Sequence, residues 1–181
     1  AAGDVVQPNI TYDGHNFSTF DQINLSNVAD LTVAWTMQVG VLDQYEASPL
    51  VVGNTMYIVS PVNQSEGSGQ APNEVLAIDL NDNGKILWEF RPDVDREHGL
   101  QACCGAQTRG LQYAEGNIYY HTIDGQVFAL DGETGEALWR SIGADVTIRE
   151  HTPGNGIVVG DLYIIGIEGG ESGVRGHVSA F

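Results

Sequence analysis

Basic residues are scarce in this sequence: seven Lys and Arg stand against 24 Asp and Glu, for a formal net charge of −17. Nucleic acids and anionic membranes both bind through basic surface, so the charge argues against either as a partner. Long apolar runs are also missing, since none approaches the roughly 18 residues that a transmembrane helix needs. No basic segment followed by an apolar one opens the chain, so we expect that any export signal has been removed.

Cysteine is nearly absent: the only two, Cys103 and Cys104, are neighbours. Adjacent Cα atoms lie about 3.8 Å apart across a trans peptide, whereas an unstrained disulfide needs roughly 4.4–6.8 Å. A bridge between them would close a small, strained ring, and such strain persists mainly where its surroundings enforce it, commonly at a functional site. The alternative is two free thiols packed in a strand. The residues alone leave both readings open.

Helical periodicity is almost missing too, and residues 21–30 are the one short helix candidate. Glycine is frequent, and the apolar stretches are short and β-branched. Residues 48–60, 111–121 and 156–166 each read as strand, turn and strand. We place their turns at Gly53-Asn54, Gly116-Asn117 and Gly160-Asp161. The sequence therefore predicts an all-β protein.

The strand pattern repeats with a period of about 50 residues. Equivalent positions are occupied by Ala77, Ala129 and Ala180, and by Trp35, Trp88 and Trp139. Such a period, with about four strands in each unit, is typical of β-propeller blades. The alternative is a β-sandwich with accidental tryptophans.

We predict one partial propeller domain over residues 1–181. An N-terminal segment 1–35 precedes blade-like repeats at about 36–88, 89–139 and 140–181. Each tryptophan is expected to pack across the neighbouring blade. Propellers typically close with four to eight blades, so about three blades are expected to need further polypeptide.

Several segments, in this order, resemble the pyrroloquinoline quinone (PQQ)-dependent alcohol and methanol dehydrogenases. They are residues 21–24 with 31–35, Ala47-Ser-Pro-Leu-Val-Val52, Cys103-Cys104 with Arg109-Gly-Leu111, and Gly169-Gly-Glu-Ser-Gly-Val-Arg-Gly176. The resemblance implies an eight-bladed propeller of four-stranded antiparallel blades joined by tryptophan-docking motifs, of which this chain holds about three.

The resemblance also implies roles for residues that contact PQQ. Cys103 and Cys104 would form a vicinal disulfide on which the flat quinone stacks. Arg109 would contact one of its carboxylates, because a guanidinium suits that group. Glu46 matches an acidic contact to the cofactor edge. Thr152 is assigned to a threonine contact, with Thr147 as the other option.

The segment from 168 to 171 is expected to hold the metal. By resemblance, Glu171 is a ligand of Ca²⁺ or a lanthanide, which are hard cations that prefer oxygen. Gly169 and Gly170 would let the backbone approach the cofactor closely. The chain departs from the family at Glu168, where a serine is common. This carboxylate either favours a more highly charged metal or points away.

The histidines at 15, 98, 121, 151 and 177 show no ligand spacing, so we expect surface or structural roles.

The function that the resemblance implies is oxidation of a primary alcohol to an aldehyde, with electrons passed to a cytochrome c or a haem domain. The general-base aspartate is expected outside these residues, so the chain would be incomplete alone. A disulfide implies an oxidising compartment, hence the bacterial periplasm or secretion. The alternatives are a non-catalytic propeller scaffold or a remnant fragment.

Overall fold

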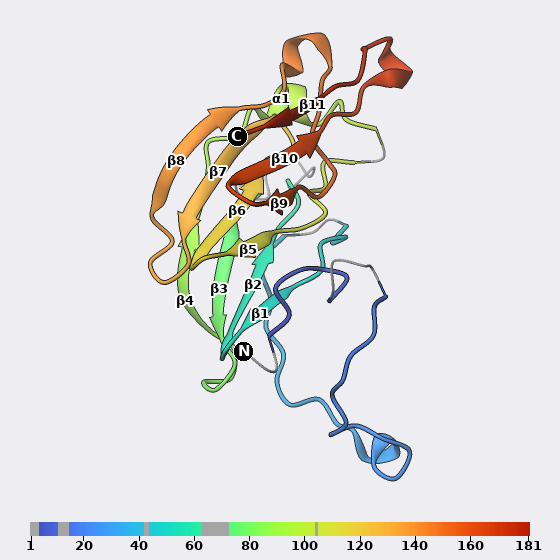
Figure 1. Ribbon diagram of the computed structural model, residues 1–181, viewed down its shortest axis with the longest axis vertical. Coiled ribbons are helices and arrows are strands. Elements are labelled where there is room, and N and C mark those ends of the chain that lie inside the picture. The colour runs from blue at the N-terminus through green and yellow to red at the C-terminus, as the bar shows by residue number, and fades with distance from the viewer. Residues whose placement is uncertain (1–3, 11–14, 42–43, 63–72, 104) are drawn as a thin grey trace.

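The computed structural model describes residues 4–10, 15–41, 44–62, 73–103 and 105–181. Its strands form three antiparallel sheets in which each strand pairs with the next along the chain (Figure 1). The first sheet contains β1 (Leu50–Val52), β2 (Thr55–Val59), β3 (Val75–Asp79) and β4 (Lys85–Phe90). The second contains β5 (Gln112–Ala114), β6 (Asn117–His121), β7 (Gln126–Asp131) and β8 (Ala137–Ile142). The third contains β9 (Ile157–Val159), β10 (Leu162–Gly166) and β11 (Val178–Ala180). The predicted all-β partial propeller is confirmed.

The sheets pack face to face through alternating apolar residues. Leu50 and Tyr57 of the first sheet and Ile118 and Tyr120 of the second belong to one buried cluster. A second cluster joins the second sheet to the third and includes Val127, Tyr163 and Ile165. Strand residues two apart point to the same face, so each strand contributes several side chains to such a cluster.

Tryptophan side chains lock the repeats as predicted. Trp35 lies on Gly84, where an added Cβ would come within 2.7 Å of its ring, and Trp88 lies on Gly135 in the same way, at 2.6 Å. The indole Nε1 of Trp88 also donates to the carbonyl oxygen of Gly132 at 3.1 Å. Trp35 and Trp88 therefore each pack on a turn one repeat further along the chain.

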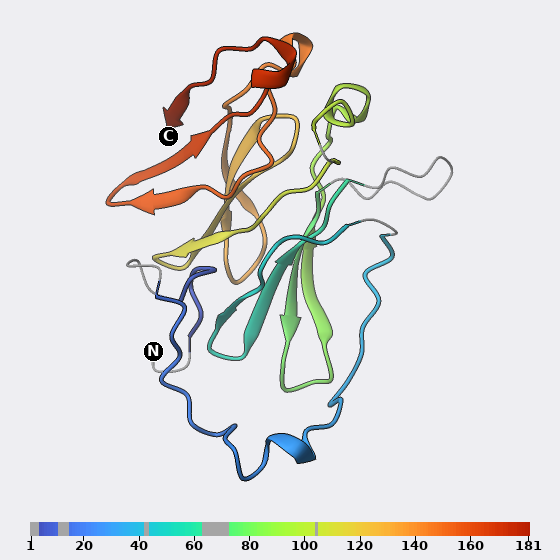
Figure 2. The ribbon, with the colours of Figure 1, turned by 90° about the vertical axis from the view of Figure 1, so that its right-hand side faces the viewer.

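Two sequence expectations need correction. The helix expected over residues 21–30 is only a 3-10 turn, η1 (Val28–Asp30), within a segment that runs away from the sheets (Figure 2). Side chains of Asn24 and Asn27 bond to the local backbone there, which competes with helix formation. The second hairpin turns at Glu115 and Gly116, one residue earlier than predicted, because Asn117 already pairs with Ala114.

Candidate functional site

The segments that precede the first strand of each sheet meet at one place. Glu46 precedes β1, and its Oε2 lies 2.8 Å from Nε of Arg109, which precedes β5. Pro153 precedes β9, and its carbonyl oxygen accepts the Arg109 backbone N–H at 3.1 Å. It also lies 3.5 Å from a terminal nitrogen of the Arg109 guanidinium. Arg109 thus ties all three sheets together, and the predicted Glu46 and Arg109 lie in direct contact.

Gln107 completes this arrangement, although it was not among the residues predicted for the site. Only 1% of its surface is exposed, and its Nε2 donates to Oε1 of Gln44 at 2.6 Å and to Oε1 of Glu46 at 3.3 Å. Both carboxylate oxygens of Glu46 are therefore bound, one by Gln107 and one by Arg109. The one available signal was spacing, because residues two apart in extended backbone share a face.

The double-cysteine segment lies beside the third sheet. Cys103 is exposed, and its backbone N–H donates to Oε1 of Glu168 at 3.0 Å. Cys104 lies outside the described residues, so the disulfide stays a prediction. The contact shows that the Glu168 side chain is directed toward the cysteine segment. The two alternatives for its role beside the metal stay predictions.

A second contact holds the same segment five residues earlier. The short helix α1 (Arg96–Gly99) precedes the cysteines, and the carbonyl oxygen of His98 lies 3.0 Å from Nε2 of buried His151. Because a carbonyl only accepts, this ring nitrogen is the donor. His151 and Glu168 are themselves paired through two backbone hydrogen bonds. One pair of residues therefore anchors both ends of residues 98–103.

The charges around Glu168 oppose one another. Burial raises the pKa of its carboxyl, and neighbouring Glu171 raises it further. The Cys103 N–H, His151 and Arg109 lower the same pKa. The net effect of these opposing influences is a raised pKa for the Glu168 carboxyl.

The predicted metal segment forms a tight turn, η3 (Gly170–Ser172). Gly169 has φ of 137°, and an added Cβ would come within 2.5 Å of the Arg149 carbonyl oxygen, so a side chain is excluded there. A Cβ at Gly170 would instead meet open space. Glu171 is exposed. Within the described part of the chain, no group of three or more His, Cys, Asp or Glu is arranged to hold a metal ion.

The two threonine options are both engaged within the fold. Thr152 is fully buried, and its hydroxyl donates to the Thr122 carbonyl oxygen at 2.6 Å. Thr147 is exposed, and its hydroxyl lies 2.5 Å from Oδ1 of Asp145. Of the two, only Thr152 adjoins Pro153 and hence Arg109. Its contact with a cofactor stays a prediction.

His121 stands behind the site as a structural residue. It is buried, with Nδ1 2.9 Å from the Tyr163 hydroxyl and Nε2 3.1 Å from the Gly154 carbonyl oxygen. Burial lowers its pKa to about 4, so the ring is neutral at pH 7. It joins β6 of the second sheet to β10 and to the segment that carries Pro153.

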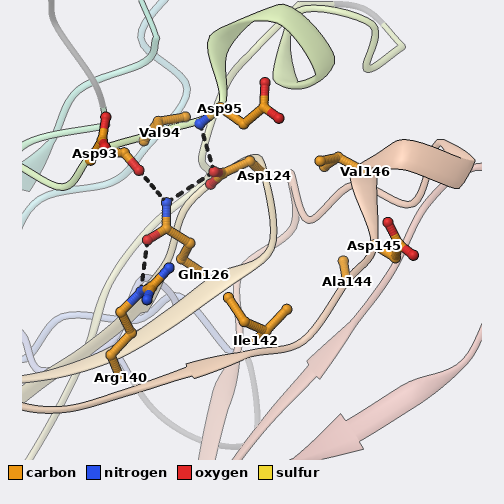
Figure 3. Close-up of a pocket in the computed structure, with 10 residues that line it drawn as sticks. All are labelled: Asp93, Val94, Asp95, Asp124, Gln126, Arg140, Ile142, Ala144, Asp145 and Val146. Atoms are coloured by element: carbon orange, nitrogen blue, oxygen red, sulfur yellow. Dashed lines mark hydrogen bonds between the residues drawn. The ribbon is translucent and has the colours of Figure 1, made fainter.

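A separate pocket of about 540 Å³ is drawn in Figure 3. Its polar centre is Gln126, whose Nε2 donates to Oδ2 of Asp124 at 2.9 Å and to the Asp93 carbonyl oxygen at 2.6 Å. Arg140 donates through Nε to Oε1 of Gln126 at 2.9 Å. These groups satisfy one another, and none of the predicted site residues lines the pocket. We therefore place the candidate site at Arg109 and not here.

Antiparallel sheets linked by tryptophan docking, with a Glu–Arg pair where their loops meet, define part of a β-propeller. The family described as "PQQ: Glucose/ethanol/alcohol dehydrogenase, beta-propeller domain" matches residues 7–138. The chain belongs to this family.

Individual relatives agree with this assignment. The chain is 44% identical to the putative dehydrogenase XoxF of Paracoccus denitrificans over 93% of its own length and 27% of that protein. It is 41% identical to a lanthanide-dependent methanol dehydrogenase of Methylacidiphilum fumariolicum, over 99% of this chain and 28% of that one. A solved europium-containing methanol dehydrogenase superposes with a TM-score of 0.90 at 41% identity, covering 100% of this chain and 30% of its own. The chain thus spans less than a third of each.

Among the residues that the structure describes, no helix is long and apolar enough to cross a membrane.

Proposed function

We propose that this chain supplies the N-terminal part of a PQQ- and metal-dependent alcohol dehydrogenase that oxidises a primary alcohol to an aldehyde. The observation that carries the proposal is a set of contacts on the third sheet's loops. Arg109, paired with Glu46, attaches to Pro153, and the Cys103 segment attaches to Glu168, which pairs with His151 two residues before Pro153. The relatives described above, two of them named as methanol dehydrogenases that use or contain a lanthanide, support it.

The residues present fit the cofactor. A guanidinium carries five N–H groups, and Arg109 uses one toward Glu46 and one toward Pro153. Three remain for a carboxylate, in a fork that matches its geometry. Gly170 leaves open space beside the backbone, and the exposed Glu171 offers the oxygen ligand that Ca²⁺ or a lanthanide prefers.

When bound, PQQ supplies a quinone carbonyl, polarised by the metal, that accepts the hydride of the alcohol. Arg109 orients the cofactor through a carboxylate, and Glu46 and Gln107 fix Arg109 in turn. Cys103 and Cys104, if joined in the predicted vicinal disulfide, would form the floor of the site. Glu171 would supply one oxygen ligand to the metal, and Gly169 and Gly170 would let their turn approach the cofactor closely. Thr152 lies at the edge of the site.

The remaining parts are assigned to polypeptide outside these residues. These are the general-base aspartate, the other metal ligands and the further blades. Electrons leave to a cytochrome c or a haem domain. A vicinal disulfide at Cys103 and Cys104 would require an oxidising compartment, so we assign the protein to the bacterial periplasm or the exterior.

The test is to purify the native protein and extract its cofactor. We expect PQQ and a bound Ca²⁺ or lanthanide by mass spectrometry, together with dye-linked oxidation of primary alcohols. The chain alone, given PQQ and metal, should show no turnover, and addition of the remaining blades should restore it. Native protein that carries neither PQQ nor activity would favour a non-catalytic propeller scaffold or a remnant and would refute the proposal.

A further inference from the structure

We propose that Glu168 is a positioning residue that anchors the backbone of the double-cysteine segment through the N–H of Cys103. Its geometry stands on the described contacts alone, and its consequence for the cofactor rests on the function proposed above. The residue is a departure of this chain from the resemblance, so the family pattern does not assign it.

The contact is a charge-assisted hydrogen bond between residues 65 positions apart, at 3.0 Å from the Cys103 nitrogen to Oε1 of Glu168. A backbone N–H that donates to an ionised carboxylate forms one of the stronger hydrogen bonds in proteins. Cys103 is exposed, so solvent would otherwise compete for this N–H. The carboxylate therefore replaces water with a fixed partner.

Glu168 can serve as an anchor because its own backbone is fixed. Two backbone hydrogen bonds, at 2.9 and 3.2 Å, join it to His151. His151 is buried and contacts the His98 carbonyl oxygen, at the other end of the same segment. Residues 98–103 are thus held at both ends by one two-residue bridge on the third sheet.

Because both ends of residues 98–103 are held, the position of this segment is fixed relative to the third sheet. A cofactor that stacks on the cysteines needs them at a fixed position relative to Arg109. Arg109 is attached to the third sheet separately, through its backbone hydrogen bond to Pro153. Loss of the Glu168 contact should free the cysteine segment while Arg109 keeps its own contacts. The expected effect is a less rigid cysteine segment, and hence weaker cofactor binding, in an otherwise intact fold.

The test compares Glu168→Leu, which removes the acceptor, with Glu168→Gln, which keeps an acceptor without charge. Hydrogen–deuterium exchange with single-amide resolution is measured at Cys103 on the native protein, isolated with any polypeptide that accompanies it and stripped of cofactor. We expect exchange at Cys103 to rise about 10-fold in Glu168→Leu and about threefold or less in Glu168→Gln. Glu133→Leu, an exposed glutamate on the turn after β7, is the matched control and should leave this amide unchanged.

Unchanged exchange at Cys103 in Glu168→Leu overturns the proposal, as does faster exchange throughout the chain, which would signal general destabilisation. A second measurement titrates PQQ by fluorescence quenching and should show about 10-fold weaker binding for Glu168→Leu, with Glu168→Gln partly rescued. Equal binding by all variants overturns the link to the cofactor. Absence of PQQ binding in the unmodified protein refutes the proposed function instead, and the exchange result still decides the anchoring role.

Discussion

The tryptophan docking makes a quantitative prediction about Gly135. This residue has φ of 75°, and an added Cβ would lie 2.6 Å from Cε3 and 2.7 Å from Cδ2 of the Trp88 ring. Gly160 has nearly the same backbone, with φ of 60°, but nothing lies within 4 Å of its Cβ position. Gly135→Ala and Gly160→Ala therefore carry the same kind of backbone strain and differ in the ring contact.

The magnitudes separate the two effects. A side chain in the left-handed region costs roughly 1–2 kcal/mol, so both variants should lose this much of the free energy of unfolding. Displacing a packed ring adds about 1–3 kcal/mol. A shifted ring also weakens the bond from Trp88 to the Gly132 carbonyl, worth about 0.5–1.5 kcal/mol, although Tyr57 also donates to that oxygen. We expect Gly135→Ala to cost about 1–4 kcal/mol more than Gly160→Ala.

The assay is urea unfolding of the native protein, with the free energy of unfolding extrapolated to water. Both glycine changes are repeated in a Trp88→Leu background as a double-mutant cycle. If the ring is the obstacle, the excess cost of Gly135→Ala should largely disappear there. Equal losses for the two variants, or an excess that persists without the indole, would refute the docking argument.

Three further outcomes follow from the site. Arg109→Lys should weaken PQQ binding about 10-fold or more, because an ammonium lacks the planar fork that binds a carboxylate through two parallel N–H groups while Nε pairs with Glu46; unchanged binding by fluorescence titration contradicts this. Glu171→Gln should lower metal content, measured by elemental mass spectrometry, without shifting the urea midpoint, whereas full retention of metal removes it as a ligand. The folded protein holds the His121 pKa at about 4, below the ordinary 6.5, so the unfolded chain binds more protons between these values and stability falls as pH drops from 6.5 to 4. His121→Asn should abolish roughly 3 kcal/mol of that pH dependence, and identical slopes of unfolding free energy against pH would contradict it.

The strands and the repeat were predictable because their signals are local. Short runs of β-branched and aromatic residues around a glycine turn specify a hairpin within about a dozen positions, and the hairpin at residues 156–166 shows both. The period of the tryptophans then indicated the sheet packing. The helix predicted over residues 21–30 was wrong because the side chains of Asn24 and Asn27 form hydrogen bonds with the local backbone. Hydrophobic periodicity does not reveal such bonds.

The site was predictable only where the resemblance named residue types. Glu46 and Arg109 are 63 positions apart, yet the structure brings them to 2.8 Å. Gln107 was missed because a buried glutamine has no sequence signature of its own. The link from Glu168 to Cys103 was missed because it joins distant loops whose separation is set by sheet packing.

The balance of charge at the site bears on the order in which its ligands bind. Glu46 pairs with Arg109, and Glu171 adds a further negative charge that raises the pKa of Glu168. The raised pKa of Glu168 shows that Arg109 and the other favourable contacts offset its burial only in part. Such a site repels a cofactor with three carboxylates, and the repulsion is stronger in partly buried surroundings than in water. A bound cation removes the excess negative charge beside Glu171. The cation should therefore bind before or together with the anionic cofactor, and Arg109, already held by Glu46, then serves to orient that cofactor more than to attract it.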